Sequence, residues 1–501
     1  MPRRDSRPPR HRSSSPGSKP PGGRPRPKTA SGDRPKPPGG RPTFKTAPRG
    51  KTMPVLAGLI ATIAPKVLRD VLDRGKRLES AIVDAQGDEA KKKSTRSDRM
   101  MINRSLASLV RWWGWIEPLK LVHVEEQLLL AWLLDAPDLP AVPRLWASRS
   151  GRDPSRLFSG GDAPNWTARA ETLKRFVAGR TVAADPWMPF PNWLRDELPL
   201  PPGEESAKIR KLHFLHAVQA PPSLWVAVRG RPPKDVWNEL HEDGLKPWVQ
   251  RKIESAARLE RDADLRRLES FQTGSLLVED LGSQAVAKVC DPDPGERWWD
   301  VGDGAGLFAL GLADEMAGKG TIISTFEHEP SRLSAVKRLR SSPYTNVAAK
   351  TWDGRRPPGK PESFDGVLVA PPSSGVGSWR RHPEVRWIIK ADQLPELVAR
   401  QKKLLALAAT AVRPGGTLVY TVGTVTLRET QGLINEFLEE SPDFRLDPFP
   451  HPLEDGETTG MLQLWPQTHD CEARFIARLV RTAKPSATPP TRTTGKNQPP
   501  S

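Results

Sequence analysis

The sequence of 501 residues contains only two cysteines, Cys290 and Cys471, and no long run of apolar side chains. Two cysteines cannot build the disulfide framework of a secreted domain, and no segment resembles a cluster of metal ligands, so no metal site is expected. The longest apolar segment, residues 53–65, is shorter than the ~20 residues that span a bilayer. Arg3 and Arg4 are not followed by an apolar region, so no secretion signal is expected. These absences favour a cytosolic protein.

Proline, glycine and positive charge are abundant. The chain has 54 prolines, 39 glycines, a mean hydropathy of −0.55 and a formal net charge of +18. Residues 1–52 hold 15 Lys and Arg against Asp5 and Asp33, with almost no apolar side chains. Such a segment cannot bury enough surface to offset the entropy of ordering, which predicts a disordered basic tail. Residues 482–501 have the same character, whereas the body of the chain is close to neutral.

The basic tail contains a duplicated segment, PPGGRPRPKTA at 20–30 and PPGGRPTFKTA at 37–47. Clustered Lys and Arg attract a polyanion such as RNA whatever its sequence. The tail is therefore interpreted as an RNA tether. A solubilising extension with no specific partner is the alternative, and the pattern leaves both open.

Three regions follow the tail. Residues 53–146 carry apolar side chains at helical spacing, which predicts an all-α bundle. Residues 147–268 are rich in Trp and Pro, which predicts a linker with a small α/β subdomain. Residues 269–481 alternate strands with helices, which predicts a mainly parallel sheet covered on both faces. The expected strands are 298–301, 321–327, 346–351, 364–370, 416–422, 461–466 and 474–480, and the expected long helices are 395–412 and 427–438.

A glycine-rich turn follows the first expected strand of the 269–481 region, and acidic residues end each of the first three strands. Glycines allow close approach of a ligand to the backbone, and ligands sit at the carboxyl ends of parallel strands. Carboxylates there can accept the hydroxyls of a ribose and the amino group of adenine, so the pattern predicts an S-adenosylmethionine (SAM) site. The residues are Asp300, Gly302, Gly304, Gly306, Glu327 and Asp353. The glycines alone also fit a dinucleotide, and ordinary helix-capping acids beside an empty site are the alternative.

Several segments resemble the RsmB/NOP/Sun family of RNA cytosine-C5 methyltransferases. The most specific is FDGVLVAPPSSGVGSWRRHPEVRW at 364–387, which is similar to a family run containing DAPCS and RRHP. The segment GGTLVYTVGTVTLRET at 415–430 resembles the family's LVYSTCS motif, and residues 270–287 and 460–481 resemble the flanking segments. The helical region is similar to the NusB-like domain of RsmB.

This resemblance implies a Rossmann-like class I SAM methyltransferase domain of the α/β class, preceded by an all-α NusB-like RNA-binding domain. It implies SAM as cofactor and RNA as partner, with ribosomal RNA as the RNA class that the resemblance indicates. The matched RRHP run implies RNA contacts from a basic loop, because arginine binds phosphate with two hydrogen bonds. The loop residues are Arg380, Arg381, His382 and Arg386.

The chain departs from the family at its catalytic positions. Gly423 stands where the family has its nucleophilic cysteine, Ser373 where it has the second cysteine, and Ala370 where it has the acid that handles the ring. Phe308 replaces the lysine of the first motif. Carbon five of cytosine reacts only after a thiolate attacks carbon six, and neither glycine nor an un-ionised serine supplies that thiolate.

The sequence therefore predicts an RsmB-type homologue that binds structured RNA and SAM but has lost cytosine-C5 transfer, a pseudoenzyme. Two alternatives remain open: an active RNA methyltransferase with altered chemistry, and a non-catalytic scaffold for RNA or ribosome assembly. An amino-group methyltransferase is disfavoured, because residues 370–373 lack the polar first and aromatic fourth residues of its loop. Asp365 opens a strand and is interpreted as structural.

Overall fold

The computed structural model describes residues 50–87, 94–136, 139–157, 165–178, 184–199, 205–302 and 305–482. The repeated segments of the basic tail, the C-terminal tail from residue 483, and Gly304 lie outside these ranges. Every described residue belongs to the second of the chain's two units, Pro48–Ser501. The expectations for the tails therefore stay predictions.

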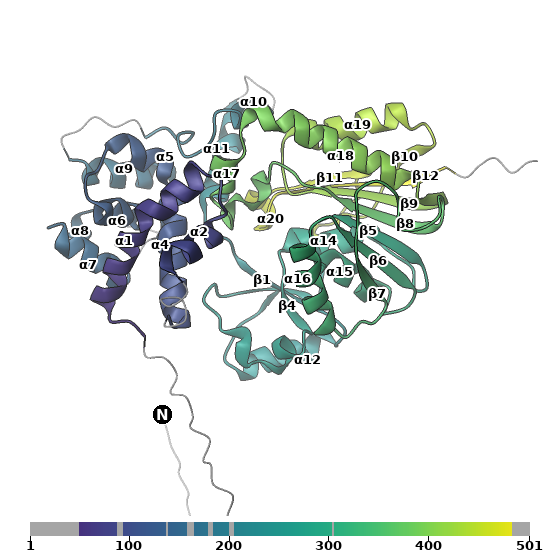
Figure 1. The fold of residues 1–501 in the computed structure, drawn as a ribbon, viewed down its shortest axis with the longest axis horizontal. Coiled ribbons are helices and arrows are strands. Elements are labelled where there is room, and N and C mark those ends of the chain that lie inside the picture. Colours follow the sequence, from purple (N-terminus) through teal and green to yellow (C-terminus); the bar gives the residue numbers. More distant parts are fainter. Residues whose placement is uncertain are drawn as a thin grey trace, which may run out of the picture. The chain divides into compact units, whose positions relative to one another are not determined.

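Helices dominate the first part of the second unit (Figure 1). They are α1 (Met53–Leu72), α2 (Leu78–Gln86), α4 (Arg96–Arg111), α5 (Trp113–Ile116), α6 (Val124–Asp135), α7 (Ala141–Arg149), α8 (Pro154–Leu157), α9 (Trp166–Phe176), α10 (Leu194–Glu197) and α11 (Glu205–Gln219). Helix α4 begins at a capping box, in which Thr95 and Asp98 each accept the other's backbone N–H. The indoles of Trp112, Trp132 and Trp146 are fully buried, so these side chains build the core of the helical region.

A small antiparallel sheet follows the helices. Its strands are β1 (Leu224–Val228), β2 (Trp248–Val249), β3 (Ala256–Leu259) and β4 (Leu276–Val278), in the order β2-β3-β1-β4. Helix α12 (Pro233–Glu242) contributes Val236 and Leu240 to the core of this subdomain. Segment 147–268, expected to hold a linker and a small α/β subdomain, thus contains helices followed by three of these strands.

The large sheet is the doubly wound arrangement that alternating strands and helices predicted. Its strands are β5 (Arg297–Gly302), β6 (Thr321–Phe326), β7 (Val347–Thr351), β8 (Phe364–Ala370), β9 (Val412–Val422), β10 (Phe444–Leu446), β11 (Met461–Leu464) and β12 (Arg474–Arg481). The order is β10-β12-β9-β8-β5-β6-β7, with β11 paired to β12. Strands β5 to β9 pair in parallel and β12 pairs antiparallel to β9. Strand order reverses beside β5, which is where ligands bind in such sheets.

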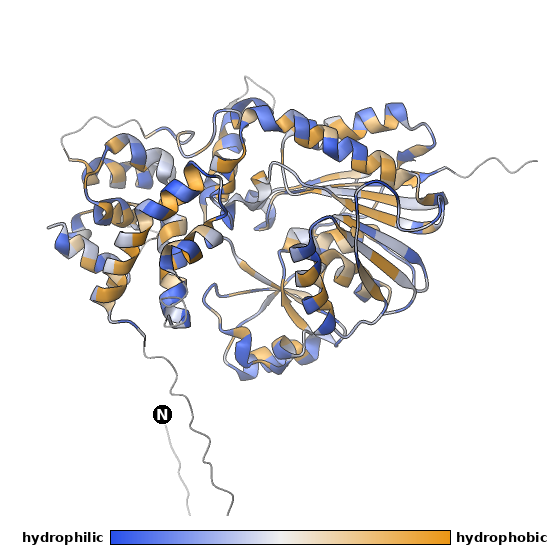
Figure 2. Cartoon of the chain, viewed as in Figure 1, coloured by the Kyte–Doolittle hydropathy of each residue, from blue (hydrophilic) through white to orange (hydrophobic). Residues whose placement is uncertain are grey.

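Both faces of the large sheet are buried. Trp298 packs into one core and its neighbour Trp299 into the other, because successive side chains of a strand point to opposite faces. The covering helices are α14 (Leu281–Cys290), α15 (Leu307–Glu315), α16 (Glu329–Arg340), α18 (Leu394–Ala409) and α19 (Gln431–Glu440). Figure 2 shows apolar residues concentrated in the central strands and on the helix faces turned toward them.

Element boundaries differ from expectation where side chains turn inward or proline intervenes. The helix expected from residue 427 begins at Gln431, after a 3-10 turn (Leu427–Glu429) whose Glu429 is fully buried. The strand expected to reach residue 466 ends at Leu464, because Pro466 opens the short helix α20 (Pro466–His469).

Side-chain hydrogen bonds to backbone carbonyls join the helical region to the large-sheet domain and tie α11 to α4 within the helical region. The guanidinium of Arg111 in α4 donates to the carbonyl of Arg380 at 3.0 Å, and the indole of Trp387 donates to the carbonyl of Val110 at 2.9 Å. The Gln219 amide at the end of α11 donates to the Arg111 carbonyl at 3.1 Å. Arg111 and Gln219 are buried, so these contacts are part of the folded core. Within the described ranges, every helix is too short or too polar to cross a membrane.

Candidate cofactor and catalytic site

The turn after β5 can be built only with glycine at its first position. Gly302 has φ of +141°, and a Cβ there would lie 2.1 Å from the carbonyl oxygen of Ala370. Gly306 also has a positive φ, of +81°, and precedes the first residue of α15. Both glycines lie where the sequence pattern placed them, at the carboxyl end of β5, whereas Gly304 is outside the described residues.

Asp300 lies inside the sheet, beneath that turn. Its carboxylate is 1% exposed and accepts a hydrogen bond of 2.6 Å from the hydroxyl of Ser324. Its Oδ1 atom has no hydrogen-bond partner among the described residues. Burial raises the pKa of Asp300 to about 7. Asp300 thus differs from Glu327 and Asp353 in exposure: its side chain is buried, whereas the side chains of the other two acids are exposed.

Glu327 and Asp353 lie together at the carboxyl ends of β6 and β7. A Cβ on Gly354 would be 3.4 Å from Oε1 of Glu327, which places the turn after β7 directly beside that carboxylate. A small cavity of about 60 Å³ is lined by Gly302, Glu327 and Trp352. Asp353 is exposed and accepts the backbone N–H of Arg355 at 3.0 Å. The strand ends therefore place one carboxylate, that of Glu327, and the Trp352 indole at the cavity, and Asp353 follows Trp352 in the chain.

Arg400 is a residue of this site that sequence reasoning missed. It reaches from α18 and forms an ion pair with Glu327, and it lines the same cavity. No local pattern marks it, because it sits among other polar residues on a helix face. A ligand that uses the Glu327 carboxylate must share it with Arg400 or displace it.

The three altered catalytic positions lie on two adjoining loops. Ala370 ends β8 and pairs with Gly302 across the sheet. Ser373 accepts the backbone N–H of Gly375 at 3.3 Å, and the carbonyl of Gly423 accepts the backbone N–H of Gly377 at 2.9 Å. The sequence placed these residues at one strand edge, and the structure brings their loops into contact.

Arg474 faces the position where the nucleophile would stand. A Cβ on Gly423 would have Nη2 of Arg474 as its nearest neighbour, at 3.7 Å, so the space beside Gly423 is open. The Arg474 guanidinium lies 5.4 Å from the centre of the Phe308 ring. Its Nε is buried without a hydrogen bond, and no described carboxylate lies within 4 Å of it. The vacated position therefore holds open space beside a cation.

Glu429 ties the two catalytic loops together. Its fully buried carboxylate accepts the backbone N–H of Ser374 at 2.8 Å, the amide of Gln401 at 2.9 Å and the hydroxyl of Thr426 at 2.6 Å. The hydroxyls of Ser374 and Thr424 complete the cluster. Hydrogen bonds of this number satisfy a buried carboxylate without an ion pair. Glu429 thereby holds the loops after β8 and β9 together. No local sequence pattern indicates this role.

Neither cysteine can take over as a nucleophile where it stands. Cys290 ends α14 and Cys471 precedes β12, and both are buried and unpaired. Burial raises the pKa of each thiol well above its ordinary value. Both thiols therefore stay protonated near neutral pH, which suppresses thiolate chemistry.

The predicted basic loop is only partly at the surface. Arg381 and His382 are partly exposed, whereas Arg380 is 6% exposed and Arg386 is fully buried. Arg386 donates to the carbonyls of Pro189, Val218 and Trp379 and to the side chain of Gln219. An arginine enclosed in this way cannot reach a phosphate without rearrangement. The structure thus corrects the expected set: Arg386 belongs to the interior, because its loop packs against α11.

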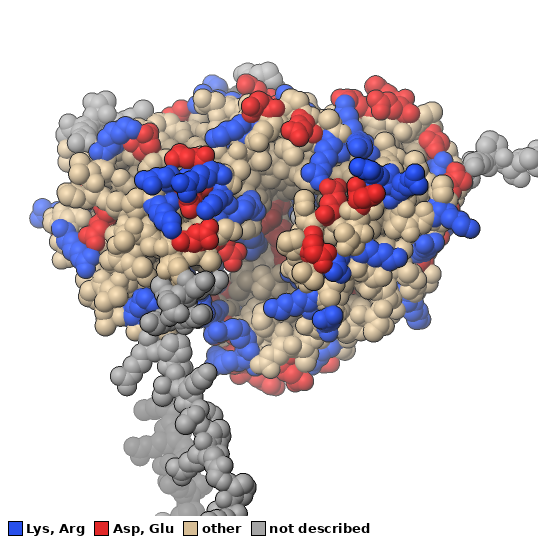
Figure 3. All heavy atoms as spheres, viewed as in Figure 1, with Lys and Arg blue, Asp and Glu red and all other residues tan. Residues whose placement is uncertain are grey.

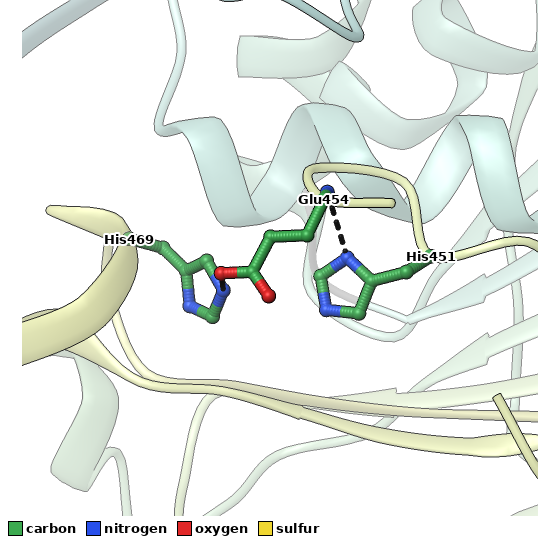
Figure 4. A group of neighbouring side chains, drawn as sticks. All are labelled: His451, Glu454 and His469. Carbon is green, nitrogen blue, oxygen red and sulfur yellow. Dashed lines mark hydrogen bonds and ion pairs between the residues drawn. The ribbon is translucent and has the colours of Figure 1, made fainter. Parts of the chain in front are cut away.

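His451, Glu454 and His469 form the group of described residues whose types suit a metal (Figure 4). Nδ1 of His451 accepts the backbone N–H of Glu454 at 3.0 Å, and Nδ1 of His469 accepts that of Trp465 at 3.3 Å. A neutral imidazole that accepts at Nδ1 carries its proton on Nε2. Nε2 of His469 lies 3.0 Å from the Glu454 carboxylate. The Glu454 carboxylate therefore lies beside Nε2 of His469, whereas His451 meets Glu454 through the backbone N–H of that residue.

Residues 287–480 match the family model of the 16S rRNA methyltransferase RsmB/F. Ribosomal RNA small subunit methyltransferase B of Salmonella arizonae is 29% identical over 302 residues, which cover 58% of this chain and 66% of that protein. The protein named "Probable ribosomal RNA small subunit methyltransferase B" of Synechocystis sp. is 31% identical over 225 residues, 43% of this chain and 50% of its own. The chain thus spans between half and two thirds of the length of these relatives.

The fold has a solved counterpart. The crystal structure of the protein PH0851 superposes with a TM-score of 0.64 at 21% sequence identity, covering 85% of this chain and 98% of that one. At this identity the likeness concerns the fold. It extends over the helical region as well as the large sheet, because the sheet domain alone is much less than 85% of the chain.

Proposed function

Because this chain is a member of the RsmB/NOP family of rRNA methyltransferases, we propose that it binds structured RNA and SAM but has lost cytosine-C5 methyl transfer. Gly423 carries this proposal. It has no side chain at the position of the family's nucleophile, and the nearest group is the Arg474 guanidinium. A guanidinium cannot add to carbon six of a pyrimidine, since it has no free electron pair when protonated.

The other two positions support the loss. Ala370 offers no hydrogen bond to a base, and the Ser373 hydroxyl already accepts a backbone N–H. An alcohol needs an adjacent base to become a nucleophile, and no described imidazole or carboxylate is hydrogen-bonded to Ser373. Hydrogen bonds to Glu429 hold the loops after β8 and β9 in place. The loops are thus ordered, although they carry neither the nucleophile nor the acid of the family.

The residues at the ends of β5, β6 and β7 fit SAM, which when bound supplies an electrophilic methyl group. Gly302 lines the cavity beside Glu327, and its missing Cβ lets the end of β5 lie against the carbonyl of Ala370. Glu327 would accept the ribose hydroxyls and Asp353 the adenine amino group, with Trp352 beside them. Asp300 would act from beneath, where its buried carboxylate ties the end of β5 to Ser324 of β6.

RNA is the partner that the relatives' names and the accessible arginines suggest. Arg381 and His382 stand at the surface near the catalytic loops, and the helical region is proposed as a NusB-like RNA-binding module. Ribosomal RNA in the cytoplasm is the proposed target. The repeated basic tail would add sequence-independent attraction.

An active RNA methyltransferase with different chemistry is the second candidate. The observation in its favour is the retained pair Glu327 and Asp353, because an adenosyl site has little use in a pure scaffold. Such an enzyme would methylate a nucleophilic atom of RNA that needs no covalent activation.

Calorimetry of SAM binding to the full chain tests the cofactor part. Glu327→Gln and Asp353→Asn should each weaken binding by about tenfold, or ~1.4 kcal/mol. Asp392→Asn, an exposed acid outside the site, is the matched control and should bind as the unmodified chain does. No heat of SAM binding in a folded chain would remove SAM from the proposal.

Mass spectrometry of rRNA separates the two candidate functions. RNA from cells that lack the protein should carry the same methylated nucleotides as RNA from cells that contain it. A methyl group that disappears with the gene and returns with the intact chain would establish the active methyltransferase instead.

A further inference from the structure

A cavity of about 770 Å³ lies between α4 of the helical region and loops at residues 221–222, 261–262 and 380–381. Arginines dominate its charged lining, against two aspartates, Asp135 and Asp262. The arginines are Arg96, Arg104, Arg111, Arg261, Arg380 and Arg381. A cavity of this size is ample for a small ligand or a stretch of a polymer.

Four of the six arginines already have acidic partners. The pairs are Arg96 with Asp264 (2.7 Å), Arg111 with Asp135 (2.7 Å), Arg380 with Asp470 (2.9 Å) and Arg381 with Glu472 (2.8 Å). Asp135 also accepts the hydroxyl of Ser108 and the indole N–H of Trp112, so it has little capacity for another arginine.

Arg104 and Arg261 are different. Within the part of the chain that the structure describes, no carboxylate lies within 4 Å of either guanidinium. Arg104 lies over the Trp132 ring, 4.5 Å from its centre, and Arg261 donates to the carbonyls of Pro221 and Pro222. Desolvation, and then the positive charges of Arg104, Arg111 and Arg380 against the opposing charge of Asp135, lower the pKa of Arg261. Arg104 and Arg261 therefore bring positive charge to the cavity without an ion pair of their own.

We propose that this cavity binds phosphate groups of RNA, with Arg104 and Arg261 as its principal ligands. The inference rests on the proposed RNA-binding function and gives it a location at the junction of the helical region and the large-sheet domain. An anion relieves the repulsion among the arginines, and the guanidinium fork matches phosphate oxygens. Met100, Ala107 and Pro221 line the same cavity and offer apolar surface to ribose or base.

Two arginines of the cavity are buried at the junction of the helical region and the large-sheet domain. Arg111 and Arg380 are buried, and the Arg111 guanidinium donates to the backbone carbonyl of Arg380. They set the shape and positive potential of the wall, and the two unpaired arginines remain available. The face drawn in Figure 3 is hollowed between α2 and α4 on one side and α16 on the other, with Lys and Arg side chains at its rim. The bound RNA would thus contact both halves of the chain.

Fluorescence anisotropy with a labelled RNA hairpin that has single-stranded flanks tests the proposal on the full chain. Arg104→Gln with Arg261→Gln should weaken binding by about tenfold or more and reduce the slope of log K against log salt by ~0.7 per lost contact. Neither arginine has an acidic partner, so the change leaves no buried carboxylate unpaired. Arg340→Gln with Arg445→Gln removes the same charge from exposed sites outside the cavity and should change both quantities less.

A second variant separates fork geometry from charge. Arg104→Lys with Arg261→Lys keeps the charge, so the salt slope should stay near that of the unmodified chain while affinity falls. Circular dichroism and thermal melting of each variant show that the fold is intact. If the unmodified chain binds the hairpin and the Gln variant behaves like the control pair, the cavity is not the RNA site, although the proposed function stands.

A free nucleotide could supply the same phosphates, and calorimetry with inorganic pyrophosphate distinguishes this source. If the chain does not bind RNA but binds pyrophosphate, and only the cavity variant loses that binding, the site takes a small phosphate compound and RNA binding fails. If the chain binds neither, both the cavity site and the proposed RNA function are overturned. RNA binding that only the cavity variant loses supports both.

Discussion

Gly423 has no side chain at the position where the resembling family has its nucleophilic cysteine. Replacing it by cysteine should be sterically simple, because the nearest atom to the new Cβ is Nη2 of Arg474 at 3.7 Å. A thiol beside a guanidinium ionises more readily, so the pKa of the introduced thiol should fall about one unit below its ordinary value. The pH dependence of alkylation by iodoacetamide, followed by mass spectrometry, measures that pKa.

Two controls isolate the effect of Arg474 on the introduced thiol. Cys290 and Cys471 are buried, so they should remain unmodified while the chain is folded. Adding Arg474→Met to the Gly423→Cys variant removes the cation and should return the thiol pKa toward its ordinary value. Equal pKa values in the two variants would show that the guanidinium is not beside residue 423.

Asp300 predicts a pH dependence of stability. Burial raises its folded pKa to about 7 from an ordinary value of 3.8, so the folded state resists its ionisation. The protonated carboxyl therefore stabilises the fold fully below about pH 4, and this contribution is lost as the pH rises toward 7. Asp300→Asn removes the titration, so the variant should gain up to about 4 kcal/mol relative to the unmodified chain across that range.

Urea unfolding of both proteins at a series of pH values checks the Asp300 prediction. Asp280 is also buried and has a pKa raised to about 6 by burial and by Glu472, but it is present in both proteins and cancels in the difference. A difference in unfolding free energy that does not change with pH would contradict the prediction.

At the scale of elements, the loops after β8 and β9 depend on one carboxylate. Glu429→Gln replaces acceptor oxygens by an amide that presents N–H groups to the donors of Ser374, Thr426 and Gln401. Leaving buried donors unpaired should reduce the free energy of unfolding by about 2–4 kcal/mol. Urea denaturation measures the loss, and hydrogen exchange at the Ser374 amide should become faster.

The matched control for Glu429 lies one helix further along the chain. Glu439→Gln makes the same chemical change on an exposed residue of α19 and should alter stability by less than about 0.5 kcal/mol. An equal effect of the two substitutions would mean that the cluster around Glu429 does not hold the loops.

The same elements show what sequence reasoning can reach. Strands alternating with helices and the glycine turn identified the large sheet, because short apolar runs and the demand for glycine at Gly302 are local properties. The inward turn of Glu429 and the reach of Arg400 to Glu327 depend on neighbours distant in the chain. Arg386 was misplaced for the same reason, since a run of basic residues does not show which side chain its loop encloses.

At the scale of the whole second unit, the helical region and the large-sheet domain should unfold together. Hydrogen bonds from Arg111 to the Arg380 carbonyl and from Trp387 to the Val110 carbonyl cross between them. Scanning calorimetry of the full chain should therefore show one transition for these regions. Trp387→Phe removes the indole N–H that Val110 accepts and should lower the free energy of unfolding by about 1–2 kcal/mol without splitting the transition.

Trp248→Phe is the control for the junction. Trp248 is 55% exposed, and its change should shift the transition less than Trp387→Phe does. Two separate transitions in the unmodified chain would show that the helical region and the large-sheet domain unfold independently. An RNA bound in the arginine cavity would then have to hold these two regions together.

The space beside Gly423 has an evolutionary consequence. The glycine codons GGU and GGC become cysteine codons through a single base change, and no described side chain has grown into the volume that a thiol would occupy. The place that a thiol would take at residue 423 is therefore not filled by another described side chain. A gene that encodes Gly423 with GGU or GGC is one base change from a cysteine that the fold can accept, whereas at Gly302 any Cβ collides with the carbonyl of Ala370.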